Sequence, residues 1–527
     1  MAGPGVAGQG KAGVARLGMA GPGAARQGKA RQARRGQARL GEARRGEAKQ
    51  GRHGAAWLGG ARQGSWSTQE TDQPNFRERE MKLSRENLHS YQHRAIEFIK
   101  THPEAYMALD CGMGKTISVL TALQEQLDAG EIKKVLILAP PRVVEHVWPT
   151  ETKNWKHVNL EVVPLVGTPK KRTALLRENH QAYAMSYDLM HWLVALYAKR
   201  TWDFDVIVAD EASMLKGHNS RRVKSIRKIR KAVERFICLS GTPSANSLLG
   251  LWGQYICCDQ GERLGTAYTR YRDRFWVDVS RMGWQWELRP GAEKHIHERI
   301  RDITVSMLAE DYLELPDLLS NDIRIYLPPN VRAIYEEIEK EFLITLEKGT
   351  DIMAPNSAVL SGKLRQISSG FLYDEEGETH DLHTAKLDAL EEVIGESGGP
   401  VLVFYEFKAD AARIKSRFKK AVDVKAKGVI EAWNRGEVPL LIGHFASMSH
   451  GLSLQHGGNV MVMYSIPWSN ELYLQAIGRL HRQGQKSTTT VHHLVAADSI
   501  DEKVLRVLGE KELTQNALLH AMKAPQC

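Results

Sequence analysis

Short apolar runs alternate with helical patterns along most of the chain after Met81. The runs that predict strands lie at 106–109, 135–139, 205–209, 236–239, 401–405, 440–443, 460–464 and 490–495. Several of them are apolar throughout, which is typical of parallel strands that are covered on both faces. Helical patterns lie between the runs, at 92–100, 115–127, 222–233, 409–420 and 472–482. Because this alternation occurs in two blocks, it predicts an α/β protein with two doubly wound, parallel-sheet lobes.

The same pattern divides the chain into four parts. Residues 1–80 lack it altogether, and we expect them to form a low-complexity tail. The first lobe is expected at 81–261 and the second at 396–527. Residues 262–395 have a mostly helical pattern, so we expect them to form a helical protrusion and linker between the lobes.

The tail is rich in Gly, Ala, Arg and Gln, and its glycines recur every five residues from Gly3 to Gly28. A period of five matches neither a helix nor a strand, so no apolar face can form. The tail carries 15 Lys and Arg against 6 Asp and Glu, which is nine of the chain's ten net positive charges. A basic arm for nucleic acid or lipid and a transit peptide both fit this composition. The five-residue period favours a third interpretation, a translated DNA repeat upstream of a native start at Met81.

Composition argues against several classes of protein. Apolar residues make up 42% and charged residues 25% of the 527 residues, as in ordinary globular proteins. The apolar runs are only long enough for strands, so we expect no transmembrane segment and no membrane partner. Five cysteines without a C-x-x-C pair argue against a disulfide scaffold and a structural zinc site. We therefore expect a cytoplasmic protein.

The first chemical motif is the sequence D-C-G-M-G-K-T, which follows a predicted strand and opens a predicted helix. A phosphate-binding loop requires this context, because Gly112 and Gly114 let backbone N–H groups approach phosphates at a helix N-terminus. Lys115 is expected to reach the β- and γ-phosphates, and Thr116 is expected to ligate Mg²⁺. Leu109 stands where the full pattern has glycine.

The second motif, V-I-V-A-D-E-A-S, places Asp210 and Glu211 at the end of an apolar strand. Two adjacent carboxylates are costly there unless they meet a cation or polarise water. We expect Asp210 to hold Mg²⁺ and Glu211 to orient and deprotonate the attacking water. Such a pair can also cap a helix, but the phosphate-binding loop upstream favours the catalytic interpretation.

Two further motifs follow along the chain. In L-S-G-T-P, Ser240 and Thr242 are expected to relay the state of the γ-phosphate, with a strand-ending turn as the plainer alternative. The sequence Q-A-I-G-R-L-H-R-Q-G-Q begins at Gln475. Its Arg479 and Arg482 are expected to share one helix face and to stabilise charge on a transferring phosphoryl group. A solvated basic face is the alternative.

The four motifs, in this order and spacing, resemble those of helicase superfamily two, and within it the Swi/Snf-related ATPases of phage and prophage type. Further segments agree, namely L-H-S-Y-Q at 88–92, A-P-P at 139–141, K-L-R-Q at 363–366 and G-L-S-L-Q at 451–455. The resemblance implies that Gln92 contacts adenine, that Gln475 contributes to nucleotide binding and that Gly451 helps to couple the lobes. It leaves open how the acidic motif is linked to the second lobe, because Ser213 stands where many relatives have His.

The resemblance also implies a function. Two RecA-like lobes would enclose ATP and Mg²⁺ and alternate their grip on a nucleic-acid backbone. The implied partner is nucleic acid, with duplex DNA favoured, and the implied output is translocation in a bacterial or phage-infected host cell. A strand-separating DNA or RNA helicase and a non-catalytic DNA-binding scaffold remain as alternatives. The sequence names no recruiting protein partner.

Two surface segments have roles that the sequence leaves open. Residues 216–235 hold nine Lys and Arg and one acidic residue, with apolar positions at helical spacing. Contact with phosphates and plain solvation both fit this basic face. Residues 268–286 interleave six aromatic residues with four arginines. They fit base stacking or a protrusion packed on the first lobe, and we favour packing.

Overall fold

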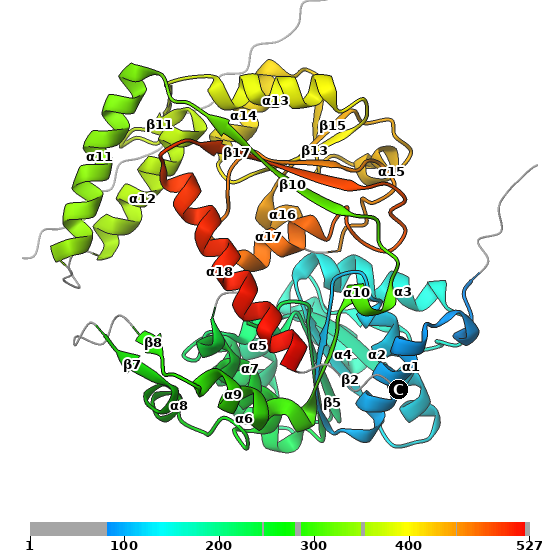
Figure 1. Ribbon diagram of the computed structural model, residues 1–527. Coiled ribbons are helices and arrows are strands. Elements are labelled where there is room, and N and C mark those ends of the chain that lie inside the picture. Colours follow the sequence, from blue (N-terminus) through cyan, green and yellow to red (C-terminus); the bar gives the residue numbers. More distant parts are fainter. Residues whose placement is uncertain (1–81, 245–246, 280–285, 349–353, 449–450, 522–527) are drawn as a thin grey trace, which may run out of the picture. The chain divides into compact units, whose positions relative to one another are not determined.

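The computed structural model describes residues 82–244, 247–279, 286–348, 354–448 and 451–521. The expectations for residues 1–80 and for a native start at Met81 lie outside these residues. Two parallel sheets with their helices form most of the described chain (Figure 1). We call the sheet with the earlier strands and its helices the first lobe, and the other sheet with its helices the second lobe.

The first sheet has seven strands in the order β3-β4-β2-β5-β6-β1-β9, and every neighbouring pair is parallel. Its strands are β1 (Glu104–Leu109), β2 (Val135–Ala139), β3 (Val162–Pro164), β4 (Ala182–Ser186), β5 (Val206–Asp210), β6 (Arg235–Ser240) and β9 (Thr304–Met307). The first lobe also contains α1 (Ser90–Thr101), α2 (Lys115–Asp128), α3 (Trp148–Asn154), α4 (Pro169–Arg177), α5 (Met190–Leu196), α6 (Arg221–Ile229) and α7 (Leu251–Asp259).

Each central strand of the first sheet is buried on both faces. Successive residues of β2 point to opposite sides, so Leu136 and Leu138 belong to one hydrophobic cluster and Val135 and Ile137 to another. The first cluster packs under α5, α6 and α7, and the second packs under α1 and α2. This is why the strands are apolar at every position and not at alternate ones.

The second sheet has six strands in the order β10-β17-β16-β13-β15-β14, again all parallel. Its strands are β10 (Leu318–Ile325), β13 (Val401–Tyr405), β14 (Ala421–Asp423), β15 (Leu440–His444), β16 (Val460–Met463) and β17 (Thr489–Ala496). The second lobe also contains α11 (Pro329–Lys348), α12 (Ala354–Ser369), α13 (Ala385–Glu396), α14 (Lys408–Arg417), α15 (Val429–Asn434), α16 (Phe445–Met448), α17 (Asn470–Ile477) and α18 (Ile500–Ala521). Two clusters divide its strand residues in the same way as in the first lobe.

The fold class predicted from the sequence is confirmed, and all eight predicted strands are present within two residues of their expected bounds. The segment 262–395 is less separate than its helical pattern suggests. Its strand β9 joins the first sheet beside β1, and its strand β10 joins the second sheet beside β17. Neither has a readable apolar run, because β9 has four residues and β10 is an edge strand with mostly exposed positions.

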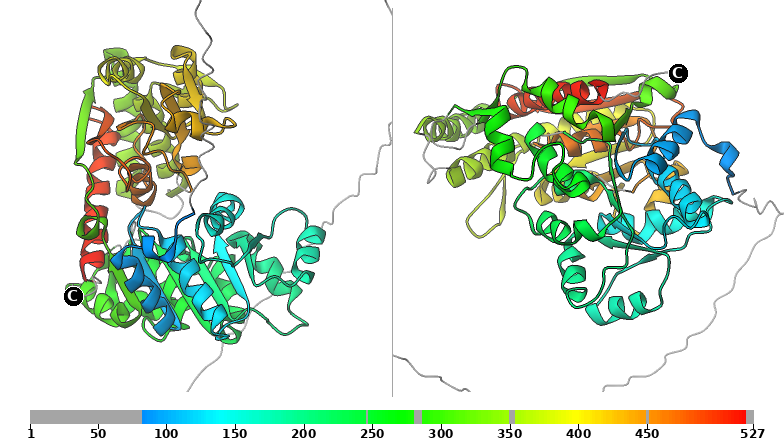
Figure 2. Two further views of the ribbon diagram at one scale, coloured as in Figure 1. Left: turned by 90° about the vertical axis from the view of Figure 1, so that its right-hand side faces the viewer. Right: turned by 90° about the horizontal axis from the view of Figure 1, so that it is seen from below.

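Helix α18 runs from the second lobe to the first (Figure 1 and Figure 2). Near its start, Val504 and Leu508 are buried in the core of the second lobe. Near its end, Leu518 and Leu519 belong to the hydrophobic core of the first lobe. The helix therefore has an apolar anchor in each lobe.

The protrusion of the first lobe consists of α8 (Tyr268–Phe275), β7 (Trp276–Asp278), β8 (Trp286–Leu288) and α9 (Ala292–Ile300). Tyr271, Phe275 and Trp276 are buried in the core of the first lobe, so these aromatic residues pack and do not offer a stacking surface. The Arg272 guanidinium lies 3.8 Å from the ring centre of Trp286. Trp284 and Arg281 lie outside the described residues.

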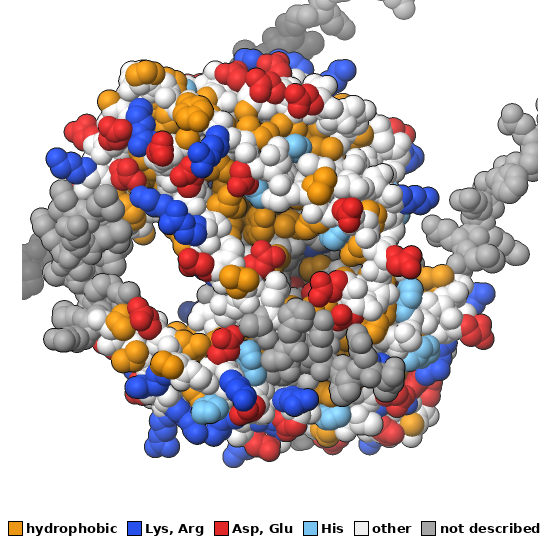
Figure 3. Space-filling view, in the orientation of Figure 1, with side chains coloured by type: hydrophobic (Ala, Val, Ile, Leu, Met, Phe, Trp, Pro, Cys, Tyr) orange, Lys and Arg blue, Asp and Glu red, His pale blue; other side chains and the backbone are white. Residues whose placement is uncertain are grey.

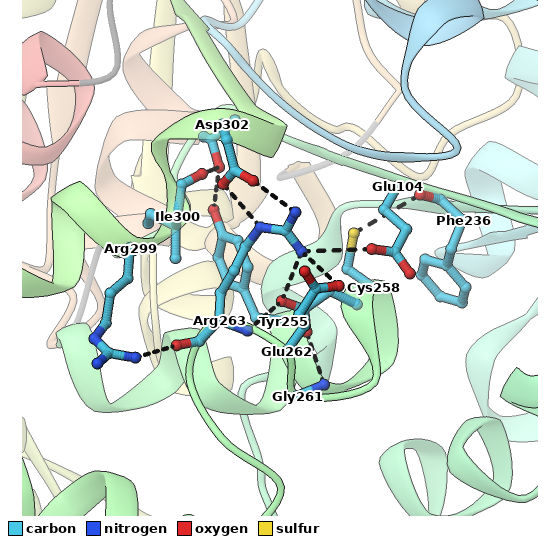
Figure 4. Close-up of polar contacts among 12 residues, drawn as sticks. Glu104, Phe236, Tyr255, Cys258, Gly261, Glu262, Arg263, Arg299, Ile300 and Asp302 are labelled. Atoms are coloured by element: carbon cyan, nitrogen blue, oxygen red, sulfur yellow. Dashed lines mark hydrogen bonds and ion pairs between the residues drawn. The ribbon is translucent and has the colours of Figure 1, made fainter.

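Arg263 ties the segment before this protrusion to the sheet (Figure 4). Its guanidinium binds both carboxylate oxygens of Asp302 at 2.8 and 2.6 Å, and its Nη1 lies 3.5 Å from Oε2 of Glu104 at the start of β1. This hydrogen bonding lowers the pKa of Asp302. Charge-assisted pairs of this kind fix direction as well as distance, so Arg263 sets how the chain enters the protrusion. No helix among the described residues is long and apolar enough to cross a membrane.

Candidate ATP site

One cavity of about 300 Å³ brings the predicted motifs together. The phosphate-loop residues Gly112, Gly114, Lys115 and Thr116 lie on one side of it, and Asp210 and Glu211 lie beside them. The second lobe supplies Gly451, Leu452, Arg479 and Arg482. Residues that are more than 300 positions apart in sequence therefore share one site.

The phosphate loop is shaped by glycine. Gly114 is the N-cap of α2 and has a φ of 70°, in the left-handed region that glycine adopts most easily. A Cβ at this position would lie 2.2 Å from Nε2 of Gln92, so no other residue fits without movement. The Lys115 ammonium donates to the carbonyl oxygens of Leu109 and Asp110 at 2.8 and 3.2 Å. The loop thus holds Lys115 at the mouth of a helix N-terminus, where an anion is favoured.

The two carboxylates at the end of β5 are held in different ways. The Trp148 indole N–H donates to Oδ2 of Asp210 at 2.9 Å, and the Tyr187 hydroxyl donates to its backbone oxygen at 2.9 Å. Burial raises the pKa of Asp210. Glu211 has a φ of 61°, which is uncommon for a residue with a side chain and turns the chain sharply after the strand.

Glu211 also has a perturbed acidity. Burial, with the nearby Glu471 carboxylate as the next cause, raises the pKa of Glu211 to about 7. A carboxylate with a pKa in this range accepts a proton far more readily than an ordinary glutamate does. Its position beside Lys115 and Thr116 in the cavity is suited to a general base.

The helix that was expected to carry both arginines is shorter than predicted. Helix α17 ends at Ile477, and its C-cap is Gly478, so the prediction that Arg479 and Arg482 share a helix face is wrong. They lie in the turn that follows, because the backbone tightens there to bonds such as Arg479 N–H to Ala476 O. The two guanidinium groups still converge, since both donate to the carbonyl oxygen of Leu452, at 2.9 and 3.2 Å.

Burial lowers the pKa of both arginines, that of Arg479 to about 10. Each remains a cation at neutral pH. Two partly desolvated guanidinium groups facing a phosphate-binding loop have a strong preference for an anion between them.

Close backbone contacts join the two sides of the site. A Cβ at Gly478 would lie 3.0 Å from the Cβ of Cys111 in the phosphate loop. A Cβ at Gly451, which has a φ of 68°, would lie 2.9 Å from Cγ2 of Val147. The expected coupling residue Gly451 thus lies directly at a contact between the lobes.

Four other expected site residues, Gln92, Gln475, Ser240 and Thr242, lie outside the lining of the cavity. The Gln92 carboxamide is buried against the loop, where it accepts from His89 N at 2.8 Å and lies 3.4 Å from Met113 O. Gln475 is buried one turn before Arg479, and its Oε1 has no hydrogen-bond partner among the described residues. Ser240 is buried and accepts from the backbone N–H of Thr242.

The oxygen atoms that could hold a metal ion fit Mg²⁺. The Thr116 and Asp210 side chains line the same cavity and offer hard oxygen ligands. Among the described residues, no group of three or more His, Cys, Asp or Glu side chains is placed to hold a metal ion. An open site of this kind suits Mg²⁺, which prefers one or two protein ligands with water and phosphate oxygens.

Sequence reasoning missed several residues that shape the site. Trp148 and Leu452 hold Asp210 and the arginines, yet an indole and a backbone carbonyl carry no motif. Gln515 of α18 donates to Gly241 O at 3.1 Å and accepts from Ser244 N at 3.0 Å. Glu471 lies beside Ser213, and the only sequence signal for it was an acid in the first turn of a helix.

The basic segment 216–235 is partly structural. Arg230 is buried and donates to the carbonyl oxygens of Cys257 and Cys258, and Arg235 donates to those at the end of α1. The remaining cations of α6 are exposed or half-buried. Lys and Arg side chains are seen along the lower edge of the face in Figure 3, where α6 and α8 lie.

Comparison with known families covers both lobes. Residues 55–364 match the SNF2-related domain, and residues 385–484 match the helicase conserved C-terminal domain. The chain is 38% identical over 452 residues to "Putative protein p41" of Acyrthosiphon pisum secondary endosymbiont phage 1. That match covers 82% of this chain and 98% of the phage protein.

More distant similarity extends to bacterial proteins and to a solved structure. The "Putative ATP-dependent helicase/translocase YwqA" of Bacillus subtilis is 25% identical over 446 residues. The match covers 79% of this chain and 46% of the Bacillus protein, so the chain spans less than half of that relative. The structure "Sulfolobus solfataricus SWI2/SNF2 ATPase core in complex with dsDNA" is 18% identical, covers 83% of this chain and 94% of that chain, and has a TM-score of 0.40.

Proposed function

The chain belongs to the SNF2-related family of helicase-like ATPases, and on that premise we propose that it uses ATP hydrolysis to translocate along double-stranded DNA. One observation supports the proposal most directly. A phosphate loop, an acidic pair and two arginines from the other lobe line a single cavity. This is the set of groups that phosphoryl transfer to water requires.

In this proposal the first lobe binds the nucleotide. Backbone N–H groups of the loop and the Lys115 ammonium hold the β- and γ-phosphates. Lys115 exchanges its bonds to the Leu109 and Asp110 carbonyls for bonds to phosphate. Thr116 and Asp210 hold Mg²⁺, which neutralises charge that develops on the phosphate oxygens. The Gln92 amide donates to Met113 O of the loop, and its proposed contact with adenine requires the amide to leave this bond.

Hydrolysis in this proposal needs both lobes. Glu211 orients the attacking water and accepts its proton, for which a pKa of about 7 is well suited. Arg479 and Arg482 stabilise the charge of the transferring group from the opposite side. Gln475 supports these arginines from the preceding turn, since its backbone oxygen accepts from Nε of Arg479.

Coupling to DNA follows from the position of the site between the lobes. Ser240 ends β6 and Thr242 follows it, and Gly451 lies against Val147 of the first lobe. A change at the γ-phosphate is therefore transmitted to contacts between the lobes, which move relative to one another on duplex DNA. The Bacillus relative is named a putative ATP-dependent helicase/translocase, which agrees with a motor that moves along nucleic acid.

The test is steady-state ATP hydrolysis by the full chain at one fixed low salt concentration. No polymer, duplex DNA, single-stranded DNA and RNA are compared. We expect strong stimulation by duplex DNA, together with ATP-dependent displacement of a triplex-forming strand from that duplex. Stimulation by single strands or RNA alone would favour the unwinding helicase instead. Binding of DNA and ATP without hydrolysis under any condition would favour the non-catalytic scaffold.

A further inference from the structure

A second contact between the lobes lies away from the arginines, at the first turn of α17. The Ser213 hydroxyl is 2.5 Å from Oε1 of Glu471 and 3.1 Å from Oε1 of Glu211. The Lys216 ammonium is 2.9 Å from Oε2 of Glu471. Glu471 belongs to the second lobe and the other three residues belong to the first. A chain of polar groups thus runs from the proposed base, Glu211, to the other lobe.

Ser213 cannot donate to both carboxylates. A hydroxyl carries one hydrogen, and the shorter distance assigns that hydrogen to Glu471. The Glu471 carboxylate is nearly buried and is held in place by its ion pair with Lys216, so its other oxygen is well positioned to accept from Ser213. In this arrangement the Glu211 oxygen that faces Ser213 lacks the hydrogen bond that the hydroxyl would otherwise give it.

Glu471 lies on the same short helix that leads into the turn with the arginines. Glu471 lies in the first turn of α17, where the helix dipole favours an acid, and Arg479 follows its last turn. A helix of eight residues is about 12 Å long, so its two ends move together as one body. When the lobes approach, Glu471 reaches Ser213 as the arginines reach the phosphate loop.

A cavity of about 190 Å³ gives this contact room to open. Ser213, Lys216 and Glu471 line it together with Thr242, whose buried Oγ1 has no hydrogen-bond partner in the part of the chain that the structure describes. The Glu471 side chain can therefore move away from Ser213 without a clash with packed neighbours. Thr242, an expected coupling residue, thus borders the same space as the contact between the lobes.

We propose that Glu471 is a positioning residue that releases Glu211 for catalysis when the lobes close. With the lobes apart, Ser213 donates a hydrogen bond to Glu211, and this bond makes the Glu211 oxygen unavailable to the attacking water. With the lobes together, Glu471 takes the hydrogen, and the Glu211 oxygen becomes free to accept the proton of the attacking water. The inference rests on the proposed function of the cavity and explains how serine replaces histidine in the acidic motif. It adds a link that makes hydrolysis depend on closure.

The test compares Glu471→Gln and Ser213→Ala, alone and combined. An amide oxygen competes poorly with a carboxylate for the hydroxyl hydrogen, so Glu471→Gln should lower the DNA-stimulated kcat roughly tenfold or more. The KM for ATP and the half-saturating DNA concentration should stay within about twofold. Ser213→Ala removes the hydrogen altogether and should raise hydrolysis without DNA several-fold. In the Ser213→Ala background, Glu471→Gln should have no further effect.

The matched control is Glu510→Gln, the same substitution at an exposed carboxylate of α18. It should leave every parameter unchanged. Recovery of the Glu471→Gln rate at saturating ATP and DNA would mean that the contact only holds the lobes together, and would overturn the proposal. Additive effects in the double variant would overturn it as well, as would a Ser213→Ala variant that merely loses activity.

A second readout separates this proposal from the proposed function. Amide exchange at Met214 and Lys216, whose N–H groups bond to Glu211 and Ser213 carbonyls, is measured with a non-hydrolysable ATP analogue. Glu471→Gln should speed exchange at these two amides, and Glu510→Gln should not. A parent protein that hydrolyses no ATP with any polymer would refute the proposed function alone. Unchanged exchange in Glu471→Gln would refute the positioning role alone.

Discussion

The two lobes place their functional groups by different means. In the first lobe, the phosphate loop follows β1 and the acidic pair ends β5, so buried parallel strands set both positions. Gly114 and Glu211 then fix direction through left-handed backbone conformations. In the second lobe, Arg479 and Arg482 lie beyond the end of a helix, and both donate to the carbonyl oxygen of Leu452, while Arg479 also donates to that of Gln475.

This difference suggests that the two lobes have separate tasks in the site. Strand ends and backbone turns keep their geometry whether or not the other lobe is near. The arginine side chains lie beyond the end of a helix, so they face the phosphate loop only when the lobes meet. We therefore expect nucleotide binding to belong to the first lobe and rate acceleration to depend on the second. Substitutions in each lobe test this expected division.

The largest expected effect is that of Arg482→Ala. The variant should lose roughly 10³–10⁵ in DNA-stimulated kcat, because a guanidinium no longer faces the charge of the transferring group. Binding of a fluorescent ATP analogue, measured by titration, should change little, since the loop of the first lobe is intact. Arg506→Ala removes an exposed arginine of α18 and serves as the control. A parallel loss of binding and kcat would contradict the division between the lobes.

Glu211→Gln should have the next largest effect. The amide keeps the size of the side chain but cannot accept the proton, so turnover should fall roughly 10²–10⁴-fold. Single-turnover hydrolysis by the DNA complex is the measurement. Glu234→Gln, at an exposed carboxylate of the same lobe, is the control. Full turnover in Glu211→Gln would show that Glu211 is not the base.

The first lobe's half of the site was the more predictable half. Local sequence determines the geometry of a glycine-rich loop between a strand and a helix, and of two acids at the end of an apolar strand. Both features can therefore be recognised from the sequence. Asp210 and Glu211 could be placed at a strand end without knowledge of any distant residue. The apolar strands were equally readable, since burial on both faces leaves an unbroken apolar run.

The second lobe's half depends on contacts that sequence does not display. The end of α17 at Ile477 was missed, because the motif continues with helix-compatible residues after Gly478. The partner of Ser213 was left open and proves to be Glu471, 258 residues away along the chain. Edge strands β9 and β10 were also missed, since short or exposed strands have no apolar pattern. Each failure concerns a feature fixed by tertiary packing.

A smaller effect is expected from Gln515→Ala on α18. Its carboxamide is buried and bonds to Gly241 O and Ser244 N of the first lobe, so truncation leaves these backbone groups without partners. The cost should be about 1–3 kcal/mol of unfolding free energy. Thermal unfolding and DNA-stimulated turnover should both fall, while Asn516→Ala, at the exposed neighbouring position, should change neither. Lower turnover without lower stability would mean that α18 acts on catalysis directly.

The smallest expected effect comes from Gly478→Ala, and it tests the contrast most finely. Gly478 has a φ of −65°, which alanine adopts without strain, so the second lobe should fold normally. The added Cβ would lie 3.0 Å from the Cβ of Cys111 across the lobe contact. Keeping the lobes slightly apart there should cost about 1 kcal/mol, or roughly fivefold in DNA-stimulated turnover at limiting ATP. Cys111→Gly removes the opposing Cβ and should restore the rate in the double variant. A loss that is unaffected by Cys111→Gly, or that is matched by a lower melting temperature, would place the effect inside the second lobe and weaken the view that its contribution depends on closure.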